Sequence, residues 1–129
     1  MTFNGSIDHV VFRVAEIGRT RRFYSVFLGE PEMASESMVL FRVGPTMLFF
    51  TLPLAAESRP IEKEQIGFNH FAFAVTSLEE LQAIGGQLDG GGIVHSGVKI
   101  DAHGGKEYIW LDDPDGLRLE FYLRLKQGA

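Results

Sequence analysis

The stretch His9-Val10-Val11-Phe12-Arg13-Val14 returns in pattern later in the chain, as His70-Phe71-Ala72-Phe73-Ala74-Val75. Both stretches read His-x-x-Phe-x-Val. The two histidines are 61 residues apart (70 − 9), which is close to half of the 129-residue chain. A repeat at this spacing predicts two similar halves, each of which begins with the same strand.

The two faces of the repeated strand differ in kind. Side chains on a strand alternate between its faces, so the phenylalanine and the valine share one face and the histidine lies on the other. In the second copy the neighbours of His70 on its face are Ala72 and Ala74, which leave open space in front of the imidazole. The same register in both copies favours a concave site with two histidines. The alternative is two histidines hydrogen-bonded to neighbouring loops.

Composition limits the classes of protein that the chain can be. Its hydrophobic content of 45% and charged content of 22% are those of an ordinary globular protein. The net charge of −5, without a basic run, argues against nucleic acid and anionic membranes as partners. The chain has no cysteine, so a metal would be held by histidine and carboxylate. With no apolar run of membrane-spanning length and no signal-peptide layout, we expect a cytoplasmic protein.

The residue pattern of each half predicts the element order β-α-β-β-β. In the first half, the expected elements are a strand at 7–14, a helix at 15–28, and strands at 32–35, 38–43 and 46–52. In the second half, they are a strand at 68–75, a helix opened by 76–80 and ended by the glycines 90–92, and strands at 93–98, 106–111 and 117–123. Ser77 and Glu80 fit a capping box at the start of the second helix. The halves occupy about 5–53 and 67–124 of one domain that spans 1–129, and a linker at about 54–66 joins them.

A glutamate lies in the last predicted strand, on the face opposite Leu119 and Phe121. If Leu48-Phe49-Phe50 is aligned with Leu119-Glu120-Phe121, Phe49 falls in the slot equivalent to that of Glu120. On an edge strand this glutamate would simply meet water, so alone it is weak evidence for a site.

Two histidines and one long run of residues resemble a known superfamily. His9, His70 and Trp110-Leu111-Asp112-Asp113-Pro114-Asp115-Gly116-Leu117-Arg118-Leu119-Glu120-Phe121 are similar to the vicinal oxygen chelate superfamily, which includes glyoxalase I, bleomycin resistance proteins and extradiol dioxygenases. The resemblance implies an α+β fold in which two βαβββ modules form a cup-shaped, half-open mixed sheet. It also implies one divalent metal ion, bound by His9, His70 and Glu120.

The chemistry of these three groups agrees with the implied site. Two imidazoles and a carboxylate suit Fe, Mn, Zn or Ni, whereas Mg and Ca prefer shells of oxygen. Three protein ligands leave coordination positions open for water and substrate, as in catalytic sites. Because Phe49 can neither ligate a metal nor accept a proton, it disfavours the four-ligand mechanism of glyoxalase I. Ring-cleaving oxygenation, isomerisation and addition to an epoxide stay open as reactions.

The remaining site predictions concern the walls of the cup. The expected substrate pocket contains Val11, Phe49, Ala72, Trp110 and Tyr122. The expected catalytic residues are His103, in a glycine-containing loop able to close over the cup, and Tyr108, on the same strand face as Trp110.

The sequence leaves two kinds of function open. The first is a metal-dependent enzyme, a lyase, isomerase or dioxygenase, that acts on a small oxygen-rich substrate. The second is a metal-free protein of the bleomycin resistance type that sequesters a small molecule between aromatic walls. The presence of all three ligand residues favours the enzyme. Because short members of this superfamily usually work as homodimers, the resemblance implies a homodimer, in which the modules can be swapped between chains.

Overall fold

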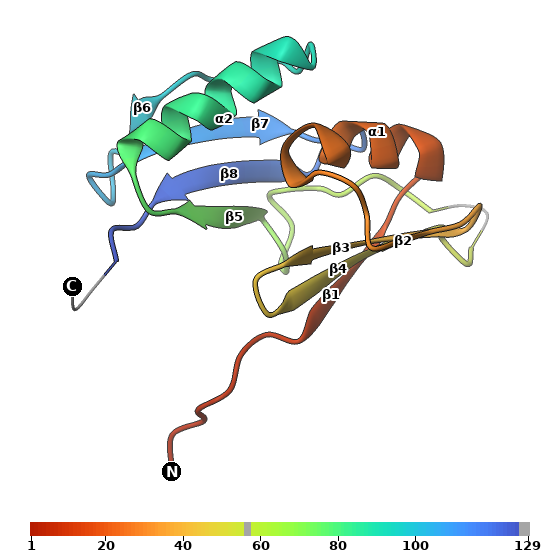
Figure 1. The fold of residues 1–129 in the computed structure, drawn as a ribbon. Helices are drawn as coiled ribbons and strands as arrows, with labels where there is room; N and C mark the ends of the chain where they lie inside the picture. The colour runs from red at the N-terminus through yellow and green to blue at the C-terminus, as the bar shows by residue number, and fades with distance from the viewer. Residues whose placement is uncertain (56–57, 127–129) are drawn as a thin grey trace. The chain divides into compact units, whose positions relative to one another are not determined.

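The computed structural model describes residues 1–55 and 58–126, so Ala56 and Glu57 of the predicted linker lie outside the described residues. The contacts divide the chain into two compact units, 1–59 and 60–129, and the boundary falls within the predicted linker. Each unit has the order β-α-β-β-β (Figure 1). The predicted α+β class with two βαβββ modules is confirmed.

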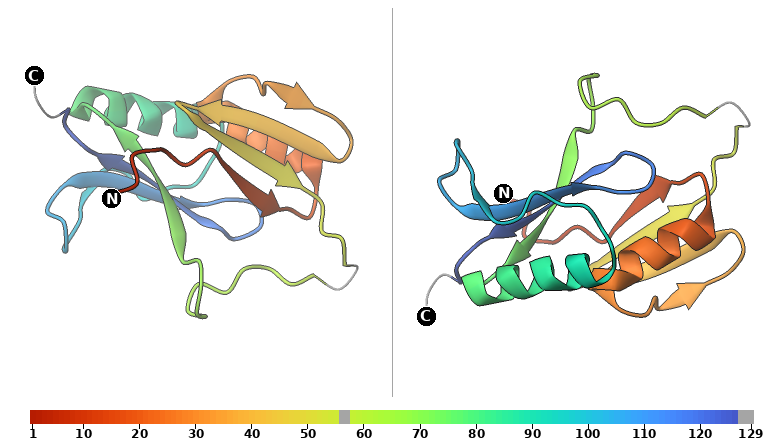
Figure 2. Two further views of the ribbon diagram at one scale, coloured as in Figure 1. Left: turned by 90° about the horizontal axis from the view of Figure 1, so that it is seen from below. Right: turned by 90° about the horizontal axis from the view of Figure 1, so that it is seen from above.

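The first unit is a four-stranded mixed sheet with one helix. It contains β1 (His9–Arg13), α1 (Ile17–Leu28), β2 (Met33–Ala34), β3 (Met38–Val43) and β4 (Thr46–Thr51). The strand order is β1-β4-β3-β2, with β1 parallel to β4 and the other pairs antiparallel. Seen from below, the strands of this unit lie in front of α1, and seen from above, α1 lies in front of them (Figure 2). The helix therefore covers only one face of the sheet.

The second unit repeats this topology. It contains β5 (His70–Val75), α2 (Leu78–Gly90), β6 (Lys99–Ile100), β7 (Glu107–Asp112) and β8 (Arg118–Leu123). The strand order is β5-β8-β7-β6, with β5 parallel to β8. Leu81 and Leu88 of α2 are fully buried, as are Ile109 and Leu111 of β7. Burial of each such side chain contributes about 2 kcal/mol, so this face of the sheet is the core of the unit.

The turn between β7 and β8 is built around a buried aspartate. One carboxylate oxygen of Asp113 accepts hydrogen bonds from the backbone N–H of Asp115 and of Leu117, each at 2.9 Å. Gly116 has a φ of +86°, which only glycine adopts without strain. This turn fixes the register of the hairpin, in which Trp110 stands opposite Glu120.

The predicted strand at 93–98 is wrong, because the sheet there contains only β6, which begins at Lys99. The reason lies in His95. Its Nδ1 accepts the backbone N–H of Gly97 at 3.0 Å, and its Nε2 donates to Asp89 at 2.7 Å. The His95 side chain thus accepts the Gly97 N–H, which a strand would have used to pair with its neighbour. The positive φ of Gly97 also bends the chain away from an extended conformation.

The start of α2 follows the predicted capping box with one change. The Ser77 hydroxyl accepts the backbone N–H of Glu80 at 3.0 Å, as expected. The Glu80 carboxylate, however, accepts the N–H of Thr76 at 3.3 Å, one residue earlier than the box requires. No helix in the described part of the chain has both the length and the apolar character needed to cross a membrane.

Candidate functional site

The face of the second sheet that α2 does not cover contains an open cavity of about 740 Å³. Ligand pockets of proteins commonly measure about 300–1,000 Å³. Strands β5, β7 and β8 and the loop that begins at Asp101 form its wall, with the lining residues His70, Ala72, Phe73, Ala74, Asp101, His103, Gly104, Tyr108, Glu120, Tyr122 and Arg124. All of them belong to one unit, so the cavity is complete within residues 60–129.

The sheet register explains which side chains meet at one end of this cavity. Ala72 of β5 stands opposite Glu120 of β8, so the methyl group of the alanine leaves the carboxylate room. His70 lies two residues before Ala72 on the same face of β5. Its Nε2 is 3.5 Å from Oε1 of Glu120, and the side chains of His70 and Glu120 are 41% and 18% exposed. The second unit therefore holds an imidazole and a carboxylate side by side, in reach of solvent.

The neighbour of His70 in the sequence determines which ring nitrogen is free. His70 Nδ1 lies 2.6 Å from Oδ1 of Asn69, and Asn69 Nδ2 donates to the backbone carbonyl of Lys63 at 2.7 Å. Because the amide NH₂ is engaged by Lys63, its oxygen faces the ring and can only accept. Nδ1 therefore donates to Asn69, and Nε2 is the ring nitrogen that faces Glu120. Metal-binding histidines are commonly held in this way.

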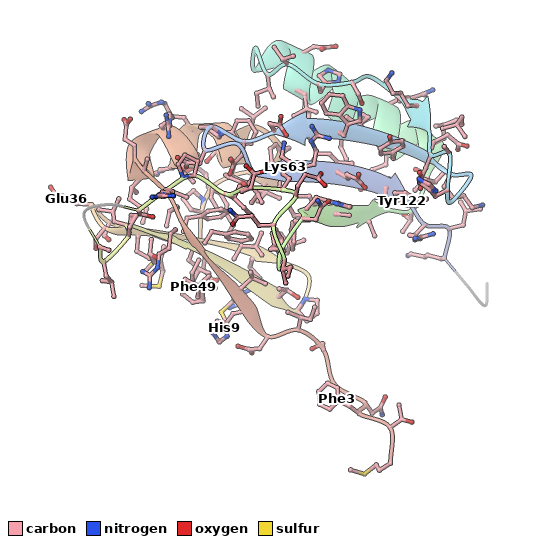
Figure 3. The ribbon with its side chains drawn as sticks, turned by 180° about the vertical axis from the view of Figure 1, so that it is seen from behind. Phe3, His9, Glu36, Phe49, Lys63 and Tyr122 are labelled. Atoms are coloured by element: carbon pink, nitrogen blue, oxygen red, sulfur yellow. The ribbon has the colours of Figure 1, made fainter. Side chains whose placement is uncertain are left out.

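The first unit holds the other histidine of the repeat in a related manner. His9 Nδ1 donates to Oδ2 of Asp8 at 2.7 Å. Its ring meets that of Phe49 nearly edge on, with 5.7 Å between centroids (Figure 3). Val11 stands opposite Phe49 as Ala72 stands opposite Glu120, which places Phe49 in the slot that the sequence alignment assigned to it.

The other end of the cavity is organised by a carboxylate that the sequence pattern did not single out. Oδ2 of Asp101 accepts the hydroxyl of Tyr122 at 2.7 Å and the backbone N–H of Gly104 at 3.1 Å. Oδ1 accepts the N–H of His103 at 3.1 Å. The hydrogen bond from Tyr122 is the main reason why the pKa of Asp101 is lowered, and the same bond raises the pKa of Tyr122.

The structure brings six of the ten predicted site residues to one cavity. These are His70, Ala72, His103, Tyr108, Glu120 and Tyr122. Trp110 lies on the same face of β7 as Tyr108 and stands opposite Glu120, but it is not part of the cavity lining. The guanidinium of Arg118 lies 4.1 Å from the centre of the Trp110 ring.

The other three predicted residues, His9, Val11 and Phe49, belong to the first unit. Within the described ranges 1–55 and 58–126, no three His, Asp or Glu side chains gather closely enough to hold a metal ion. His70 and Glu120 are side chains of a suitable type for metal ligands, and their role as ligands, with His9 as the third, stays a prediction.

Among the residues at the site that were not predicted from the sequence, Asn69, Asp101 and Arg124 carry polar groups. A signal existed for Asp101, since aspartate two or three residues before glycine commonly accepts N–H groups of its own turn. The sequence around Asn69 and Arg124 contains no such signal. Their roles depend on the side chains that the fold places beside them.

The fold and the histidine–carboxylate pair can now be compared with known proteins. The sequence pattern of the Glyoxalase/Bleomycin resistance protein/Dioxygenase superfamily matches residues 6–121, and the chain belongs to this superfamily. The predicted family is therefore confirmed.

Individual proteins are similar to this chain in sequence or in fold. The uncharacterized protein YaeR of Escherichia coli K12 is 32% identical over 73 residues, a match that spans 57% of this chain and about half (54%) of that protein. A glyoxalase family protein from Enterococcus faecalis is 28% identical and has a TM-score of 0.70 over 91% of this chain and 96% of its own. A lactoylglutathione lyase from Agrobacterium tumefaciens is 19% identical, with a TM-score of 0.71 over 93% and 94% of the two chains, and shows likeness of fold alone.

Proposed function

We propose that the protein is a divalent-metal-dependent enzyme, a lyase, isomerase or dioxygenase, that acts on a small oxygen-rich substrate. The observation that supports this most directly is the state of His70. Its Nδ1 is held by Asn69, and its Nε2 lies 3.5 Å from Oε1 of Glu120 in an open cavity. The proposed third ligand is His9, by its match to the superfamily pattern.

The donor set fits such an ion. Two neutral imidazoles and one carboxylate suit Fe, Mn, Zn or Ni. When bound, the metal would supply Lewis-acid stabilisation to oxygens on which negative charge develops. Held by three protein ligands, it keeps positions open for the substrate.

The chain's own residues would bind and orient the substrate. The small side chains of Ala72 and Ala74 leave the floor of the cavity clear, so that a planar or branched molecule can approach Glu120. The aromatic rings of Tyr108 and Tyr122 supply apolar walls, with ring centroids 6.0 Å apart. The Tyr108 hydroxyl and the His103 imidazole, both in the cavity lining, are the groups proposed to hold or move a proton.

Metal analysis of the purified protein tests this proposal. We expect close to one Fe, Mn, Zn or Ni ion per chain after loading, and a large loss of bound metal in His70→Ala and in Glu120→Gln. His95→Gln is a matched control, because His95 hydrogen-bonds to Asp89 and Gly97 instead of lining the cavity. Wild-type protein that takes up none of these metals, yet binds a small molecule, would favour the sequestration function instead.

The reaction itself is identified by a substrate panel. Catechols, adducts of 2-oxoaldehydes with thiols, and epoxides are each incubated with each metal form, and product formation is followed. Turnover of one class that is lost in Glu120→Gln and kept in His95→Gln assigns the reaction. A cytoplasmic location rests on the sequence alone and stays a prediction.

A further inference from the structure

The end of the cavity away from His70 is rich in hydrogen-bond donors. Its one carboxylate, Asp101, is already engaged by the Tyr122 hydroxyl and by two backbone N–H groups. Two donor side chains line the same end, those of His103 and Arg124. The acceptors there are used by the protein itself, while donors remain available to a bound molecule.

Arg124 is the fixed positive charge of this end. It follows β8 directly, and its guanidinium lies over the ring of Tyr122, 4.4 Å from the ring centre. In the part of the chain that the structure describes, no carboxylate forms an ion pair with it. A stacked guanidinium keeps its N–H edges free and is pre-oriented, because the ring restricts its rotation.

The contrast with Arg118, the first residue of β8, supports a special role for Arg124. Arg118 also stacks on an aromatic ring, that of Trp110, at 4.1 Å. Its Nε, however, donates to Oδ1 of Asp112 at 2.7 Å, and the residue is not part of the cavity lining. Of these two stacked arginines, one has a carboxylate partner within the protein and the other faces the cavity without one.

We propose that Arg124, stacked on Tyr122, binds a carboxylate group of the substrate at the end of the cavity opposite His70 and Glu120. This inference rests on the proposed function, because it names the class of substrate for the same cavity. A single guanidinium offers two parallel N–H donors that match the two oxygens of a carboxylate. A doubly charged phosphate is disfavoured, because Glu120 and Asp101 already bring negative charge to the same cavity.

The spacing of the two ends limits the size of the substrate. Tyr122 follows Glu120 by two residues, and a strand rises about 3.3 Å per residue, so the stacked guanidinium lies roughly 7 Å along the strand from the glutamate. This is about the width of one six-membered ring with its substituents. The substrate is therefore a small acid whose carboxylate lies about one ring away from the group that approaches Glu120.

A matched set of chelating probes tests the subsite. The probes are benzohydroxamic acids, which bind metals through two adjacent oxygens, with a para carboxylate, a para carboxamide or a para phosphonate. Dissociation constants are measured calorimetrically for metal-loaded and for metal-free protein. We expect the carboxylate probe to bind wild-type protein about tenfold more tightly than the carboxamide, since a charge-assisted bidentate hydrogen bond contributes on this order.

Variants of the two arginines assign the effect. In Arg124→Gln the carboxylate and carboxamide probes should bind equally well, and Arg124→Lys should keep part of the preference. Arg118→Gln removes the same charge from the other end of β8 and should leave the preference unchanged. Circular dichroism confirms that each variant is folded.

The possible results separate this inference from the proposed function. If the protein binds no metal, all probes lose the contribution of the hydroxamate, yet a preference for the carboxylate that disappears in Arg124→Gln still supports the subsite. An equal preference in wild type and Arg124→Gln overturns it. Tighter binding of the phosphonate than of the carboxylate also overturns it, and points to a phosphorylated ligand.

Discussion

At the scale of single residues, the amide of Asn69 sets the chemistry of His70. It accepts the Nδ1 proton at 2.6 Å, while its own NH₂ is held by the Lys63 carbonyl at 2.7 Å. The segment before β5, where Figure 3 labels Lys63, thereby contributes to the orientation of a side chain on β5 itself. Asn69 is thus a positioning residue for the proposed metal site.

Replacement of Asn69 by leucine should weaken metal binding without unfolding the protein. Loss of the partner of Nδ1 lets the proton move to Nε2, and changes of this kind typically cost about 10–100-fold in metal affinity. Competition with a chelator of known affinity measures the change. Asn4→Leu, at the exposed N-terminus, is the matched control and should bind metal as wild type does. Unchanged affinity in Asn69→Leu would refute the positioning role.

The bond between Tyr122 and Asp101 predicts a pH dependence of stability. The pKa of Asp101 is lowered in the fold. The ionised carboxylate therefore contributes to stability at pH values above its ordinary pKa of 3.8, and this contribution is lost as the pH falls through the pKa of the folded state. The pKa of Tyr122 is raised in the fold. The protonated hydroxyl therefore contributes to stability at pH values below its ordinary pKa of 10.0, and this contribution is lost as the pH rises through the pKa of the folded state. The bond therefore stabilises the fold most between these limits.

Tyr122→Phe isolates this contribution. We expect the Tm difference between wild type and variant to be constant from about pH 5 to pH 9, and to shrink below about pH 4 and above about pH 10. Thermal unfolding across the range measures it. A difference that stays the same at pH 3 would mean that the hydrogen bond from the Tyr122 hydroxyl to the ionised Asp101 is not its source.

At the scale of elements, the loop from Asp101 to Lys106 depends on a close approach of its backbone to β8. A Cβ atom built at Gly104 would collide with the hydroxyl oxygen of Tyr122 and would come 2.8 Å from Oδ2 of Asp101. The backbone N–H of Asp101 donates to the Lys106 carbonyl at 2.8 Å, which closes the base of the loop. Only glycine at 104 lets the loop sit against Tyr122.

Two glycine substitutions should therefore act in opposite directions. Gly104→Ala should lower the free energy of unfolding by about 1–3 kcal/mol, the usual cost of overpacking, and weaken probe binding in the cavity. Gly86→Ala, on the exposed side of α2 with no atom within 4 Å of the new methyl group, should raise it by about 0.5–1 kcal/mol. Chemical denaturation measures both, and a neutral Gly104→Ala would show that the loop moves freely.

The elements also show what the sequence could predict. Alternating apolar residues in β5 and β8, and the capped helix between them, were predictable because burial imposes a period on the residues that face the core. The strand predicted at 93–98 failed because His95 takes the N–H of Gly97, and such a local bond leaves no periodic trace. For the site, the repeat identified His70 and the resemblance to the superfamily identified Glu120, whereas Arg124 and Asp101 gain importance only through the side chains that the fold places beside them.

At the scale of the whole molecule, each unit has an edge strand that begins with its histidine. Within their own described sheets, β1 and β5 are the first strands in the order and pair on one side only, with β4 and β8. Val11 of β1 is 50% exposed, so this edge strand also presents an accessible apolar side chain. Open edges of this kind favour pairing with another strand.

We propose a homodimer on these grounds, in agreement with the expectation from the superfamily. Light scattering of the purified protein should give twice the 14.4 kDa mass of the chain. Val11→Lys, which places a charge on the β1 edge, should shift the mass toward that of one chain. A single-chain mass for wild type at micromolar concentration would contradict the proposal.

Phe49 and Glu120 occupy matching registers in two halves that otherwise share their topology. A chain that arose by duplication of one ancestral half would have begun with the same residue at both positions. The two positions now carry different residues. The second half carries the acidic group as Glu120, and the first half carries Phe49, whose ring meets that of His9. New chemistry in such a scaffold can therefore evolve by exchange at a single slot, while the duplicated framework stays untouched.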